Sequence, residues 1–144
     1  MRLEKQFDVK APREVAAAVL KSDDALVGLF PDSETEVVER KGGRRTTRTK
    51  YTALGREGVA TFHFDLADDG NVRFEKVCDG RIWKELHGAV TFASRGQGTR
   101  VTIEMEGRTK SLIPEFTIRG PMQEQIDQMA AALRKKLQAA AKQA

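Results

Sequence analysis

Two lysines occupy strand positions that sequence alternation assigns to the protein interior. Lys76 follows Phe74 by two residues, and Lys84 precedes Leu86 by two. Side chains two residues apart in a strand face the same side, so each lysine would point inward with its apolar neighbour. A buried ammonium without a partner is costly. Three interpretations stay open: the lysines reach solvent at the sheet edge, a bulge reverses the phase, or they line a cavity and meet an anion.

The segment 44–54 adds two polar groups to this set. The phase that turns Tyr51 inward also turns Thr49, Thr47 and Arg45 inward. With the two lysines, Arg45 and Tyr51 would form a polar cluster that orients an acidic or oxygen-rich ligand in a mostly apolar pocket. A cyclase- or hydrolase-type enzyme could use the same four groups as acids, bases or oxyanion donors, provided that they converge on one open site.

The other reactive residue types form no recognisable site. His63 and His87 fall in the outward phase on strands separated by another strand, roughly 10 Å apart at about 4.8 Å per strand, so a shared metal is not expected. Cys78 has no histidine near it in the sequence and is expected to pack as a small apolar group. The glycines of residues 95–98 lack the lysine of a phosphate-binding loop. We therefore expect neither a metal nor a cofactor.

Surface charge and an expected exposed tryptophan bear on partners. Alternation puts Arg44, Arg48 and Lys50 on one face, but no aromatic residues interleave with them as stacking platforms. Glutamates of the segment 34–39 could neutralise this basic stripe through cross-strand pairs, so no nucleic-acid partner is expected. Trp83 falls in the outward phase, and an exposed tryptophan is a frequent contact residue. A protein-interaction module is therefore a third hypothesis, and monomer and homodimer both stay open.

The elements that would position these side chains follow one another in a clear order. Residues 2–10 alternate as a half-buried strand, Pro12 begins a helix over 13–20, and Ser22 is a plausible N-cap for a second short helix. Turn signals such as Gly42-Gly43 and Asp79-Gly80 then separate strand candidates, which predicts an antiparallel meander. These candidates span 34–41, 44–54, 59–67, 72–78, 82–94 and 99–110.

A long amphipathic helix is predicted at the end of the chain, from Met122 to about Lys142. Its apolar positions are spaced as one helical stripe, which must lie on an apolar surface, and Gly120-Pro121 is expected to kink or interrupt its start. The stripe is Met122, Ile126, Met129, Leu133 and Leu137. We expect sheet and helix to enclose a cavity lined by Phe62, Phe64, Phe74, Leu86, Val90, Phe92, Ile103, Met105, Ile126 and Met129, together with Arg45, Tyr51, Lys76 and Lys84.

Composition sets the broad class. The 144 residues suit a single domain over 1–144, with 40% hydrophobic and 32% charged residues. No apolar run approaches the roughly 20 residues that span a bilayer, and the start of the chain lacks a secretory signal. A lone cysteine and the absence of a signal favour a cytoplasmic location. The net charge of +4 suits an anionic ligand or simple solubility.

The order of elements resembles the helix-grip superfamily, also called SRPBCC. The stretch Phe7-Asp8-Val9-Lys10-Ala11-Pro12-Arg13-Glu14-Val15 is similar to the start of many bacterial polyketide cyclase/dehydrase-like members. The resemblance implies an α+β helix-grip fold: a curved antiparallel sheet of about seven strands around a long C-terminal helix, with two short helices after the first strand. Relatives include START-like lipid-transfer and birch-pollen-allergen-like proteins. The resemblance implies binding of a small hydrophobic molecule such as a lipid, quinone or polyketide; it carries over no catalytic signature, so enzymatic activity stays open.

Overall fold

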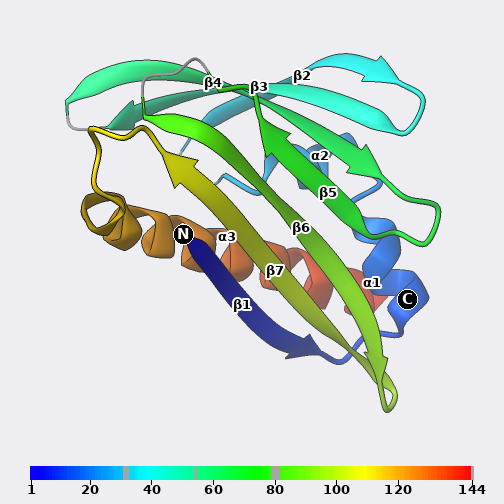
Figure 1. The fold of residues 1–144 in the computed structure, drawn as a ribbon. Coiled ribbons are helices and arrows are strands. Elements are labelled where there is room, and N and C mark those ends of the chain that lie inside the picture. The colour runs from blue at the N-terminus through cyan, green and yellow to red at the C-terminus, as the bar shows by residue number, and fades with distance from the viewer. Residues whose placement is uncertain (31–32, 54, 79–81, 144) are drawn as a thin grey trace.

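A curved antiparallel sheet holds one long helix against its concave side (Figure 1). The computed structural model describes residues 1–30, 33–53, 55–78 and 82–143. In chain order the elements are β1 (Arg2–Val9), α1 (Arg13–Val19), α2 (Asp23–Val27), β2 (Glu34–Lys41), β3 (Arg44–Ala53), β4 (Arg56–Leu66), β5 (Val72–Lys76), β6 (Trp83–Arg95), β7 (Gly98–Thr109) and α3 (Glu115–Gln143).

The sheet confirms the predicted meander. Its strands lie in the order β1-β7-β6-β5-β4-β3-β2, and each neighbouring pair is antiparallel. Strand limits differ from the predicted ones by a few residues, while position 54 and the predicted turn at Asp79-Gly80 lie outside the described residues. Ser22 caps α2 as predicted, because its Oγ accepts a hydrogen bond from the Ala25 amide at 3.2 Å.

The amphipathic stripe of α3 is buried as predicted. Met122 is 7% exposed and Leu133 is 0% exposed, and the stripe residues between and beyond them are equally covered. The helix packs against β1, β7 and α1. Lys5 at the edge strand reaches across to α3, where its Nζ lies 3.3 Å from Asp127 Oδ1. The concave side of the sheet therefore clasps the helix along its apolar face.

Of the kink or interruption predicted at Gly120-Pro121, the interruption is wrong. Pro121 lies inside one continuous α3. Proline there leaves the Thr117 carbonyl without its helical donor, a disruption that costs about 3 kcal/mol in a helix interior. Both residues are exposed, so water can bond this carbonyl. Each large stripe residue contributes roughly 1.5–3 kcal/mol on burial, which together outweighs the local penalty.

The two ends of the sheet differ in what covers them. At one end lie the N-terminus, the last residues of β3 and β5 and the β7–α3 connection, and we call this end the open end. At the other, the closed end, lie α1, α2 and the last turns of α3, as Figure 1 shows. Leu20, Leu26 and Leu29 from the α1–α2 region are fully buried. The short helices therefore close one end of the space between sheet and helix.

Candidate ligand-binding recess

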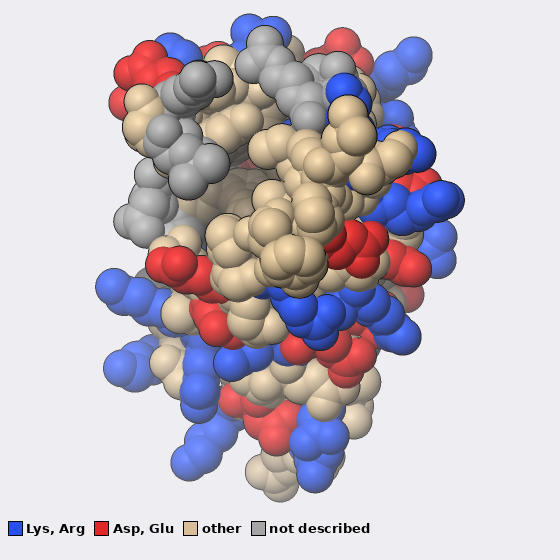
Figure 2. All heavy atoms as spheres, turned by 60° about the vertical axis from the view of Figure 1, so that its left-hand side comes forward, with Lys and Arg blue, Asp and Glu red and all other residues tan. Residues whose placement is uncertain are grey.

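A recess enters the protein at the open end. Figure 2 brings this end forward and shows a hollow whose visible wall is formed by uncharged residues. Charged side chains gather below it and to the sides. A hollow with an uncharged wall between sheet and helix is a place where a small, mostly apolar molecule can leave water. The neighbouring described residues therefore form the candidate site.

Two glycines on the inner face let aromatic rings approach the sheet closely toward the open end. The Tyr51 ring covers Gly58 on the paired strand, so that a Cβ added at Gly58 would lie 2.6 Å from Tyr51 Cζ. Likewise a Cβ at Gly107 would lie 2.6 Å from Trp83 Cζ3. A glycine in a strand permits such a close approach and a sharper bend of the sheet. Sequence alternation alone did not identify these ring–glycine pairs.

Residual exposure divides the predicted cavity lining into two parts. Phe62 and Leu86 keep 6% and 5% of their surface accessible, Tyr51 and Lys76 are half-buried, and Met122 of the α3 stripe, which was not among the predicted lining residues, keeps 7%. The other apolar lining residues keep 4% or less, and several have no accessible surface, which indicates close packing around them. This second group comprises Phe64, Phe74, Val90, Phe92, Ile103, Met105, Ile126 and Met129.

The outward placement of Trp83 is wrong, and of the three interpretations for Lys84 the structure supports the bulge rather than a place in the cavity lining. Trp83 is buried at 6% exposure, whereas Ile82 and Lys84 are exposed. The β6–β7 register shifts between Trp83 and Glu85, which identifies a bulge at Lys84. A bulge adds one residue to a strand and reverses the phase beyond it. The three-residue spacing from Trp83 to Leu86, which strict alternation cannot place on one face, was the available sequence signal.

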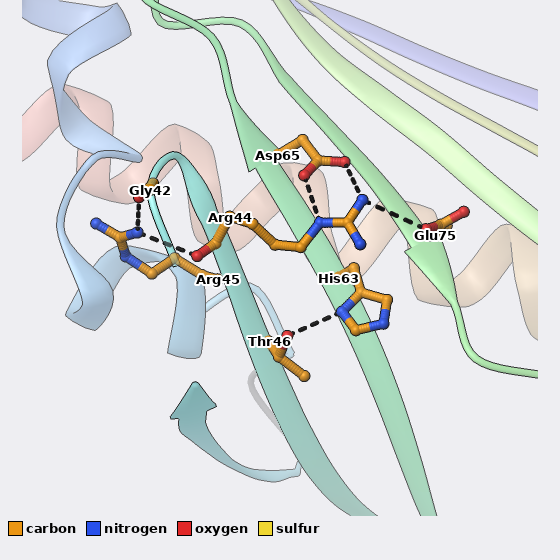
Figure 3. A network of polar contacts seen from close by, with 7 residues as sticks. All are labelled: Gly42, Arg44, Arg45, Thr46, His63, Asp65 and Glu75. Carbon is orange, nitrogen blue, oxygen red and sulfur yellow. Dashed lines mark hydrogen bonds and ion pairs between the residues drawn. The ribbon is translucent and has the colours of Figure 1, made fainter. Parts of the chain in front are cut away.

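Arg45 faces the inner side but does not join the recess. Its Nη1 donates to the Gly42 carbonyl at 2.8 Å, as Figure 3 shows, and its Nε lies 3.4 Å from Asp23 Oδ1. Arg40 Nε also donates to Asp23, at 2.7 Å to Oδ2. Arg45 therefore fastens α2 to the β2–β3 hairpin. Tyr51 lies six residues further along β3, roughly 20 Å away at 3.3 Å per residue.

Lys76 and Tyr51 are the members of the predicted polar cluster that are half-buried on the inner face of the sheet toward the open end. Lys76 pairs in register with Phe62 and so shares the inner face. It makes no ion pair with any residue that the structure describes. Cys78 follows on the same strand phase, and its Sγ lies 3.6 Å from the Lys76 carbonyl oxygen. A cation and a phenol beside an apolar hollow can bind a carboxylate or a polarised carbonyl.

The outer face carries paired charges rather than a second site. Arg44 donates to both Asp65 oxygens, at 2.7 and 3.0 Å, and lowers the pKa of that carboxyl below its ordinary value, mainly through these hydrogen bonds (Figure 3). His63 Nδ1 lies 2.8 Å from Thr46 Oγ1. His63 and His87 face outward, as predicted. Among the described residues no group of His, Cys, Asp and Glu could hold a metal ion.

A groove of about 980 Å³ lies at the closed end, between the β1–α1 connection and the β6–β7 hairpin. Polar and charged side chains dominate its lining, Asp8, Arg13 and Arg95 among them. Arg100 donates to Asp8 Oδ1 at 3.0 Å and lowers the pKa of that carboxyl. The groove is open to water, and its polar lining suits an apolar molecule less well than the recess does.

Comparisons with known proteins place the fold. No family model matches the chain, and no curated protein matches it. A protein of Thermus thermophilus superposes with a TM-score of 0.80 at 22% identity, covering 98% of this chain and 99% of that one. The Zhui aromatase/cyclase of a Streptomyces species superposes at 0.75 with 15% identity, covering 99% and 93%. A START superfamily protein of Mycobacterium smegmatis superposes at 0.76 with 15% identity, covering 96% and 97%.

These likenesses extend over nearly the whole chain, at identities that establish fold and not activity. Within the described residues, no helix combines the length and apolar character needed to cross a membrane. The seven-stranded sheet, the two short helices after β1 and the clasped α3 agree with the architecture that the sequence predicted. The chain therefore has the helix-grip fold of the START-like and aromatase/cyclase structures.

Proposed function

We propose that this protein binds a small, mostly apolar molecule with one acidic or oxygen-rich group in the recess at the open end. The observation that carries the proposal is the hollow with an uncharged wall in Figure 2, at the end of the sheet where half-buried Tyr51 and Lys76 lie near the ends of their strands on the inner face. The apolar part of the ligand would lie near Phe62, Leu86 and Met122. Lys76 Nζ would donate to its anionic group. Fatty acids, quinones and polyketide-like molecules share this chemistry.

The names of the fold neighbours support the same class of ligand. A START superfamily member and an aromatase/cyclase have this architecture. The alternative of a cyclase- or hydrolase-type enzyme required four converging polar groups. Lys84 is exposed and Arg45 is bound to Asp23 near the closed end, so that set does not assemble. The interaction-module hypothesis relied on the basic strand face or on an exposed Trp83; Trp83 is buried, so only the basic face with its exposed Arg48 and Lys50 is left to support it.

Displacement of a fluorescent apolar probe by decanoate tests the proposal. Ala60 lies on the inner face of β4 between Gly58 and Phe62, so Ala60→Leu should fill part of the recess and weaken probe binding at least about tenfold. Ala93→Leu makes the same chemical change at an exposed position of β6 and should leave binding unchanged. If wild-type protein binds no probe, or if both variants bind it equally, the proposal is wrong.

The role of Lys76 has its own test. Lys76→Met keeps the length of the side chain and removes its charge. Wild type should prefer decanoate over methyl decanoate, and the variant should lose about tenfold of that preference, because a hydrogen bond to a charged group contributes about 1.5–3 kcal/mol. An unchanged preference would remove Lys76 from the site while leaving apolar binding in place.

A further inference from the structure

Two large apolar side chains stand in water at the open end. Leu112 is 95% exposed and Phe116 is 80% exposed, the highest values among the large hydrophobic residues described as exposed. Leu112 lies in the connection from β7 to α3 and Phe116 in the first turn of α3, at the open end. Exposed apolar groups of this size beside an opening commonly mark a contact surface.

Hydrogen bonds hold this segment in a defined shape. The Ile113 amide donates to the Lys110 carbonyl at 2.9 Å, and Thr109 Oγ1 donates to the Ile113 carbonyl at 2.7 Å. Thr117 donates to the Pro114 carbonyl from both its amide, at 3.1 Å, and its hydroxyl, at 2.7 Å. The turn therefore presents Leu112 and Phe116 outward as part of an ordered structure.

Three cations lie in the same stretch of chain as the two apolar side chains. Arg108, Lys110 and Arg119 are exposed, and none forms an ion pair with a described residue, although Glu85 is the cross-strand partner of Arg108. The acid of the same segment, Glu115, is neutralised by the N-terminal ammonium, whose nitrogen lies 3.2 Å from its Oε2. Cations near the head groups of an anionic membrane contribute about 1 kcal/mol each. Such charges and two apolar side chains together match the interface of an anionic bilayer.

We propose that this surface, Leu112 and Phe116 with Arg108, Lys110 and Arg119, docks the open end onto an anionic lipid bilayer. The inference rests on the proposed function, because a bilayer is a source of apolar ligands for the recess. Area favours a bilayer over a second copy of the chain. A leucine and a phenylalanine bury at most about 400 Å², whereas a stable protein interface buries about 800 Å² per partner. Reversible membrane binding needs only a few inserted groups and nearby cations.

Sedimentation with vesicles of phosphatidylcholine, with and without phosphatidylserine, tests this proposal on the full chain. Wild type should bind the phosphatidylserine vesicles at least about tenfold more tightly than the neutral ones, and binding should weaken as salt rises. Leu112→Ser/Phe116→Ser should lose at least about tenfold of vesicle binding. Val38→Ser removes an exposed apolar side chain of β2 (43% exposed) and should bind like wild type.

Three results would overturn the docking surface. In the first, wild type binds neither kind of vesicle. In the second, the double variant binds vesicles as tightly as wild type and as the control Val38→Ser. Sedimentation equilibrium could instead show a dimer that the double variant abolishes, which would assign the surface to a second copy. Decanoate displacement on wild type without vesicles separates the two proposals. If wild-type protein does not bind the fluorescent probe, the proposed function is wrong, whatever the vesicle experiment shows. If wild type binds the probe but does not bind vesicles, only the docking inference is wrong.

Discussion

Gly88 tests the inner packing of the sheet, because its neighbours leave no room for a methyl group. A Cβ built there would lie 2.4 Å from Phe74 Cζ and 2.3 Å from the Glu104 carbonyl oxygen. Real Cβ contacts are not this short, and the carbonyl belongs to the backbone of β7, which cannot rotate away as a side chain would. Gly88→Ala must therefore shift β7 relative to β6 or displace the Phe74 ring.

The size and sign of the change in the free energy of unfolding follow from two opposing effects. Alanine restricts the unfolded chain and would stabilise the protein by about 0.4–1 kcal/mol if the folded state accepted it. Overpacking a close-packed interior costs typically about 1–3 kcal/mol, and a backbone contact places Gly88→Ala toward the upper part of this range. We therefore expect the free energy of unfolding to fall by about 1–2 kcal/mol. Guanidinium unfolding with an unchanged slope would measure it.

Gly120→Ala is the control, since it makes the same substitution without a close contact to another part of the fold. Apart from its chain neighbours and the backbone of its own helix, no atom lies within 4 Å of the Cβ position at Gly120, which lies inside α3. Alanine exceeds glycine in a helix interior by about 0.8–1.0 kcal/mol, but a Cβ directly before Pro121 opposes this gain, so the variant should lose less stability than Gly88→Ala. A Gly88→Ala protein at least as stable as wild type would refute the packing described here.

Three further predictions concern single side chains. Thr47 Oγ1 is buried without a hydrogen-bond partner among the described residues, so Thr47→Val should raise the free energy of unfolding by about 1 kcal/mol in urea; a loss would mean that the hydroxyl is bonded. Gly58→Ala meets only the movable ring end of Tyr51, so decanoate affinity should change more than stability; the reverse would contradict this geometry. Because Arg44 lowers the pKa of Asp65, the pair stabilises the fold above the unfolded pKa near 3.8 and loses this effect as pH falls through the lower, folded value. The difference in the free energy of unfolding between wild type and Arg44→Gln should therefore shrink from about pH 6 to about pH 3. A difference that grew over this range would contradict the lowered pKa of Asp65.

Local patterns in the sequence were sufficient for much of the fold. The helical stripe around Met129 and Leu133 depends on a spacing that any apolar surface can satisfy, and both residues are buried. The cap at Ser22 involves residues three positions apart. Alternation likewise placed Thr47 and Tyr51 on the inner face, because their strand continues without a bulge. These features need no knowledge of distant residues.

The candidate site depended on contacts that the sequence does not display. A bulge at Lys84 moved this lysine out and Trp83 in, and bulges arise from pairing with a neighbouring strand. Arg45 forms an ion pair with Asp23 of α2, and the alternation within a strand gives no information on such a contact with a distant helix. Pro121 lies inside a continuous helix because burial of the whole apolar stripe outweighs the cost of a proline in a helix interior. The predicted cluster of four polar groups was therefore reduced to two.

Carbon-13 methyl NMR of the four methionines during titration with decanoate tests the central claim most directly. Met122 keeps accessible surface near the recess, at 7% exposure, whereas Met129 is 1% exposed within the packed core. If an apolar ligand enters at the open end, the Met122 signal should shift strongly and saturably while the Met129 signal moves little. An unchanged Met122 signal, at decanoate concentrations that saturate probe displacement, would contradict the recess as the binding site.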